Sequence, residues 1–75
     1  MKKFDAGQLR LARRNAGLKI KDVATVLHLA PSTIAAKENG SIRVGADELS
    51  AFAYLYGVSC EQFFVVPIKS LTDKV

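Results

Sequence analysis

Residues 20–40 read IKDVATVLHLAPSTIAAKENG, and this stretch holds two short helical patterns with a break between them. Apolar residues recur at i, i+3, i+4 and i+7 in the first part, which predicts a helix over about residues 20–27. Pro31 suits the first turn of a second helix, because the N–H that proline lacks has no partner there. Asn39 and Gly40 tolerate the left-handed conformation that ends a helix. Two helices of about eight residues, joined by about three or four, have the spacing of a helix-turn-helix.

The flanking sequence predicts three further helices. Apolar side chains at helical spacing indicate one helix over about residues 5–16 and another over about residues 46–56. Ser59 and Gln62 have the pattern of a capping box, which begins a short fifth helix. The apolar residues after that helix have no periodicity of their own, and we find no convincing interior strand.

The chain is therefore expected to be all-α, with five short helices in one domain over residues 1–64 and an apolar tail over residues 65–75. Its 75 residues are 49% hydrophobic and 24% charged, which is a globular composition. A single cysteine and a single histidine exclude an internal disulfide and a four-ligand zinc site. Because no nucleophile–base pairing, glycine-rich phosphate loop or carboxylate pair is present, we expect no enzyme, metal or cofactor. No apolar run approaches the roughly 18 residues of a membrane span, so the chain is expected to be cytoplasmic.

Positive charge is concentrated in the first part of the chain. The formal net charge is +4, yet residues 1–43 hold nine Lys and Arg against three Asp and Glu, while residues 44–75 hold two against four. Such asymmetry favours one surface that faces a polyanion and another that does not, although ordinary scatter of surface charge explains it as well.

Several short motifs occur in one order along the chain. They are Leu9-Arg10, Arg13 and Ala16-Gly17-Leu18, then Val23-Ala24, Leu27, Ser32-Thr33-Ile34 and Glu38-Asn39-Gly40, and later Leu49, Phe52-Ala53, Leu55-Tyr56-Gly57-Val58-Ser59 and Phe63-Phe64. Together they make residues 5–64 resemble the Cro/repressor-type (Xre-like) helix-turn-helix family. The resemblance implies a lambda-repressor-like DNA-binding domain whose third helix enters the major groove of double-stranded DNA. It also implies a partly buried salt bridge between Arg13 and Glu38.

The chain departs from the family pattern where DNA is usually contacted. Lys19 and Ile20 stand where Ser or Thr followed by Gln is common, and Ile20 cannot donate to a phosphate. His28 replaces the glycine of the turn, and Ala30 replaces the usual Ser or Thr cap of the third helix. The third helix therefore favours binding by shape and phosphate contacts more clearly than strict base reading, with alanine contacts to thymine methyl groups as a low-information supplement.

The two lysines at the start of the second helix are the most informative candidates. Lys19 and Lys21 lie at the positive end of the helix dipole, where cations are unfavourable unless an anion such as a phosphate docks there. Asn39 is explained equally by DNA contact and by helix termination, and Thr33 equally by DNA contact and by a local hydrogen bond. The candidate DNA-binding residues are Lys19, Lys21, Pro31, Ser32, Thr33, Ala36, Lys37, Asn39 and Arg43.

The apolar end of the chain is a candidate dimerisation segment. Its members are Phe63, Phe64, Val65, Val66 and Ile68. A two-fold dimer would place two recognition helices about one DNA turn apart, whereas the alternative is that this segment folds over its own core. The sequence thus predicts a homodimeric, DNA-binding transcriptional regulator, a repressor that recognises sequence or shape. The alternative is a protein-interaction module, antitoxin-like or an adaptor subunit, with a protein partner and weak DNA binding.

Overall fold

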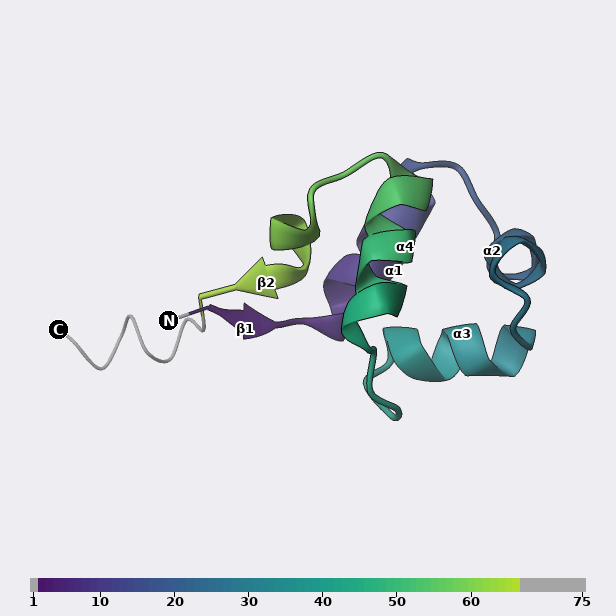
Figure 1. The fold of residues 1–75 in the computed structure, drawn as a ribbon, viewed down its shortest axis with the longest axis horizontal. Helices are drawn as coiled ribbons and strands as arrows, with labels where there is room; N and C mark the ends of the chain where they lie inside the picture. Colours follow the sequence, from purple (N-terminus) through teal and green to yellow (C-terminus); the bar gives the residue numbers. More distant parts are fainter. Residues whose placement is uncertain (1, 67–75) are drawn as a thin grey trace, which may run out of the picture.

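The computed structural model describes residues 2–66, which form four α-helices, one short 3-10 helix and a two-stranded sheet (Figure 1). In chain order the elements are β1 (Lys3–Phe4), α1 (Ala6–Asn15), α2 (Ile20–Leu27), α3 (Pro31–Glu38), α4 (Ala46–Tyr56), the 3-10 helix η1 (Cys60–Phe63) and β2 (Phe64–Val65). The mostly helical class is as expected, but the fifth helix is the 3-10 turn η1. Ser59 begins that turn, where its Oγ accepts a hydrogen bond from the N–H of Glu61 at 3.3 Å.

A short antiparallel sheet joins the two ends of the described chain. Lys3 pairs with Val65 and Phe4 with Phe64, and the N–H of Asp5 donates to the carbonyl of Phe63 at 2.8 Å. The sequence analysis did not predict these two strands, which lie at the ends of the described chain and not in its interior. The expected boundary after residue 64 falls inside β2, so that Val65 belongs to the folded domain.

The core lies between α1, α2, α3, α4 and η1. Its largest fully buried side chains are those of Phe52, Phe63, Leu9, Ile34 and Val23. Burying one such side chain stabilises the fold by about 1.5–3 kcal/mol. Because Phe63 is 0% exposed, its expected role in dimerisation is wrong, and it packs on its own core instead.

Tyr56 also belongs to this core and stacks on Phe52, with 5.9 Å between the ring centroids. Within residues 2–66 its buried hydroxyl has no hydrogen-bond partner. Burial raises the pKa of Tyr56 to about 12, with a smaller contribution from the Glu38 carboxylate. The ring therefore contributes by packing and not by its hydroxyl.

The turn between α2 and α3 depends on His28. This residue adopts the left-handed conformation, with φ of 57°, as the expected substitute for a glycine. Its conformation lets the N–H of Leu29 donate to the carbonyl of Ala24 at 2.9 Å, which closes the end of α2. The chain can then turn and begin α3 at Pro31 after three residues.

Among the described residues, no helix is both long enough and apolar enough to cross a membrane.

Candidate nucleic-acid interface

Helix α3 lies along one edge of the molecule, and the loop that leads from it to α4 extends at the same edge (Figure 1). Helix α2 packs against α3, and α1 packs against the other part of α3. The sheet lies at the end of the molecule opposite α2. The edge formed by α3 and its following loop therefore includes the segments that carry most of the candidate DNA-binding residues.

The outer face of α3 carries four residues at helical spacing. Ser32 and Asn39 are exposed, and Ala35 and Ala36 between them are half-buried. The expected contacts Ser32, Ala36 and Asn39 thus lie on one stripe. Pro31 is exposed at the start of the helix, and Thr33 is half-buried beside the stripe.

The start of α3 has no side-chain cap. Ala30 occupies the cap position, as the sequence indicated, and no side chain accepts a hydrogen bond from the free N–H groups there. Thr33 donates its backbone N–H to the carbonyl of Ala30 at 2.9 Å, which is a bond of the backbone itself. The expected alternative role of Thr33 as a replacement cap therefore finds no support among the described contacts.

Lys37 does not lie on the outer face, and the expectation that it contacts DNA is wrong. The whole residue is 6% exposed. Its Nζ donates to the carbonyl of Arg43 at 3.0 Å and to Oε1 of Glu48 at 2.9 Å. The same Glu48 oxygen accepts from the N–H of Gly45 at 3.0 Å. The hydrogen bond from Lys37, followed by that from Gly45, lowers the pKa of Glu48. Lys37 therefore fixes the loop between α3 and α4.

The salt bridge between Arg13 and Glu38 is present and buried. Nε of Arg13 lies 2.7 Å from Oε2 of Glu38, and its Nη2 lies 3.2 Å from Oε1. Nη1 donates to the carbonyl of Leu18 at 2.8 Å. The hydrogen bond to Glu38 raises the pKa of Arg13 further above its ordinary value, although desolvation opposes the rise. This two-pronged contact ties α3 to α1 and to the segment before α2.

The start of α2 exposes Lys19 and Lys21, as expected for residues that meet a phosphate. The N–H of Lys19 donates to Oδ2 of Asp22 at 2.9 Å. Asp22 therefore places a carboxylate in the first turn, which relieves part of the unfavourable charge that the two lysines create. A docked anion is therefore not the only group that can offset the charge of the two lysines, because Asp22 does so in part.

A groove of about 430 Å³ runs between α1, the start of α2 and the outer face of α3. Arg10 and Arg14 of α1 line it together with Ile20, Ala35 and Asn39. Both arginines are exposed. The sequence did not single out either arginine as a DNA-binding candidate, because the spacing along α1 does not reveal which helix lies opposite. The fold brings both guanidinium groups beside α3.

The loop after α3 supplies the remaining candidates. Oδ1 of Asn39 accepts a hydrogen bond from the N–H of Ser41 at 2.8 Å, and Asn39 is also the C-cap residue of α3. Asn39 thus has the structural role that the sequence analysis weighed, and its side chain is still exposed. Arg43 is exposed, while its carbonyl is held by Lys37.

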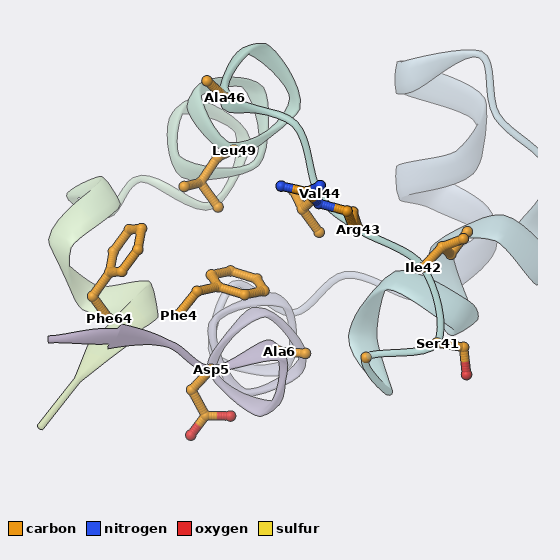
Figure 2. Close-up of a pocket in the computed structure, with 11 residues that line it drawn as sticks. Phe4, Asp5, Ala6, Ser41, Ile42, Arg43, Val44, Ala46, Leu49 and Phe64 are labelled. Atoms are coloured by element: carbon orange, nitrogen blue, oxygen red, sulfur yellow. The ribbon is translucent and has the colours of Figure 1, made fainter. Parts of the chain in front are cut away.

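A second and more apolar groove, of about 690 Å³, separates the sheet from the loop (Figure 2). Phe4, Leu49 and Val44 point toward one another across it, and Phe64 contacts Phe4 edge-on with 5.8 Å between ring centroids. Arg43 contributes to the same lining. Of the candidate dimerisation residues, Phe64 and Val65 are half-buried, Val66 is exposed, and Ile68 lies outside the described residues.

In the part of the chain that the structure describes, no group of three or more His, Cys, Asp or Glu side chains comes together.

Two eight-residue helices joined by a tight turn, with the second on the surface and exposed cations around it, define a helix-turn-helix DNA-binding domain. Comparison with family models gives the same result, since residues 6–63 match the model described as a helix-turn-helix domain. The chain belongs to this family and is, in general terms, a DNA-binding regulator. Neither a curated protein nor a solved structure matches the chain significantly.

Proposed function

We propose that this chain is a non-enzymatic transcriptional repressor of the Xre-like type, which acts in the cytoplasm as a homodimer with α3 in the major groove of duplex DNA. Occupation of a promoter is the proposed mechanism of repression. Phosphate contacts supply most of the affinity in this mode, because each cation that meets a phosphate releases a condensed counterion.

The exposed cations on the elements around α3 carry this proposal. Arg10 and Arg14 line the groove on one side of the outer face, and Arg43 follows in the loop at the other end of the helix. Lys19 and Lys21 are exposed at the start of α2. The cations of α1 and of the start of α2 would meet one of the two phosphate backbones that border a major groove, and Arg43 would meet the other, while α3 lies between them.

Fluorescence anisotropy with a labelled random duplex tests the proposal. The logarithm of the affinity should fall linearly with the logarithm of the salt concentration, with a slope of roughly −0.9 for each phosphate contacted. Absence of binding even at low salt would contradict DNA binding by this chain.

The variant Lys19→Glu with Lys21→Glu should abolish this binding and retain the helical circular dichroism spectrum. Lys2→Glu with Lys3→Glu is the matched control. It makes the same change of charge on exposed residues at the sheet, at the opposite end of the molecule from α2. Equal losses for the two double variants would show that only net charge matters and would contradict the proposed interface.

The homodimer is proposed to form through the apolar groove of Figure 2, with a second copy of the chain as the occupant. This groove adjoins the loop after α3, so that a two-fold axis beside it would leave both α3 helices on one face for adjacent turns of DNA. Ile42 lines the groove and is 43% exposed, and Val66 is 40% exposed.

Sedimentation equilibrium should give a dimer for the wild-type chain and a monomer for Ile42→Glu. Val26→Glu is the control, because Val26 is 56% exposed on α2, away from the groove. A monomeric wild-type chain would contradict the homodimer. If that monomer also bound a protein partner that Ile42→Glu releases, the function would be the alternative, an antitoxin-like or adaptor module.

A further inference from the structure

Helix α3 departs from the usual arrangement of a surface helix in where its charged residues lie. Ordinarily the apolar side faces the core and the charged side faces solvent. In α3 both charged residues, Lys37 and Glu38, are buried, at 6% and 7% exposure. The centre of the outer stripe is formed by the methyl groups of Ala35 and Ala36. The charge of this helix is thus used for internal contacts, and the outer face is almost uncharged and has short side chains.

The outer stripe offers few groups that can distinguish bases by hydrogen bonds. The side chains that read bases in pairs of hydrogen bonds are Arg, Lys, Asn and Gln. Lys37 is unavailable for this role because its Nζ is bonded to Glu48 and to the carbonyl of Arg43. Asn39 stands at the far end of the helix with its Oδ1 bonded to the N–H of Ser41. Ser32 retains one hydroxyl.

The alanine stripe continues onto α2. Ile20 lines the same groove as Ala35, and Arg10 and Arg14 lie along that groove. Ile20 and Ala35 therefore lie in the groove beside guanidinium groups that suit phosphates, and Ala36 follows Ala35 on the outer stripe; these three residues form the apolar patch. The short alanine side chains also let the helix backbone approach a ligand closely.

In the major groove, thymine is the base that presents an apolar group, its 5-methyl, at the edge. We propose that the patch of Ile20, Ala35 and Ala36 binds thymine 5-methyl groups, so that the preferred half-site is read through methyl contacts and not through paired hydrogen bonds. This inference rests on the proposed DNA-binding function and specifies which bases that site selects.

Deoxyuridine provides the direct test, because it removes the 5-methyl and leaves the hydrogen-bonding edge unchanged. Duplexes enriched by selection from a random pool are resynthesised with dU at each thymine in turn, and affinity is measured by anisotropy. At one or more half-site positions we expect a loss of about fourfold, which corresponds to one methyl group removed from a buried contact. A cytosine placed at such a position should bind better when it carries a 5-methyl group than when it does not.

A matched pair of variants locates the contact on the protein. Ile20→Gln replaces the apolar side chain of the groove by an amide and should reduce the preference for dT over dU at the affected position. Val26→Gln makes a comparable change on the same helix at an exposed residue outside this groove and should leave the preference intact. If both variants retain the preference, the patch is not the reader.

Failure of this inference can be separated from failure of the proposed function. If no duplex binds at low salt, DNA binding itself is contradicted. If duplexes bind but dT and dU give equal affinity at every position, or if selection returns half-sites without thymine, the methyl contact alone is contradicted.

Discussion

The two ends of α3 differ in how the fold holds them. At the N-terminal end, Ala30 and Pro31 leave the first N–H groups without a side-chain partner. At the C-terminal end, Glu38 is bonded to Arg13 of α1, and Lys37 is bonded to Glu48 of α4 and to the following loop. The orientation of the outer face is therefore set from the C-terminal half. The N-terminal end is the open end in that no side chain caps it, and the N–H of Thr33 bonds only to the backbone carbonyl of Ala30, at 2.9 Å.

The largest effect is expected when the contact to α1 is broken. Arg13→Met leaves the buried Glu38 carboxylate without its partner and should lower the free energy of unfolding by about 3–5 kcal/mol. Urea denaturation followed by circular dichroism measures this change.

If Arg13→Met does not fold, the double variant Arg13→Met with Glu38→Leu still tests the idea. It removes both charges and should recover most of the lost stability. A double variant that is no more stable than the single variant would show that the two residues act independently.

A smaller effect is expected at the contact to α4. Lys37→Met should lower the free energy of unfolding by about 1 kcal/mol, since the Glu48 side chain is partly exposed and the pair is screened by solvent. The folded pKa of Glu48 lies below its ordinary value of 4.5, so this stabilisation is complete above that pH and is lost as the pH falls through the folded value. The difference between the wild type and Lys37→Met should therefore be largest at neutral pH and should shrink below pH 4.5. Lys21→Met, at an exposed lysine, is the control and should show no such pH dependence.

Substitutions at the open, N-terminal end of α3 should raise the free energy of unfolding more readily than they lower it. Ala30→Ser supplies the missing cap, and we expect the free energy of unfolding to rise by about 1 kcal/mol. Thermal denaturation measures the gain. Ala35→Ser, the same substitution inside the helix, should instead lower it by up to about 0.5 kcal/mol. If both variants shift the melting temperature in the same direction, capping is not the cause.

The sequence predicted the local features of the fold better than the distant ones. The spacing around Pro31 and the left-handed turn at His28 depend on neighbours within a few residues, so pattern and propensity indicated them. The contact of Arg13 with Glu38 followed from a family resemblance, because no local pattern links residues so far apart. The two strands escaped detection because a two-residue strand has no measurable alternation.

The errors at the candidate site have one physical cause. Lys37 looks like a surface residue by type, and its burial depends on Glu48 and on the Arg43 carbonyl, which the sequence does not place beside it. Phe63 looks like part of an exposed apolar tail until the sheet folds it inward. Arg10 and Arg14 gain their position only from the packing of α1 against α3. Each of these assignments needs the tertiary fold.

The sheet also influences the order in which the elements of the chain fold. The pairing of α2 with α3 joins neighbours in the sequence, whereas Lys3 and Val65 are separated by nearly the whole described chain. Closing so long a loop costs more conformational entropy and is slow, so the strands are expected to join last and to separate first. The helix-turn-helix unit would then persist while the ends of the domain open, and hydrogen exchange would begin at β1 and β2.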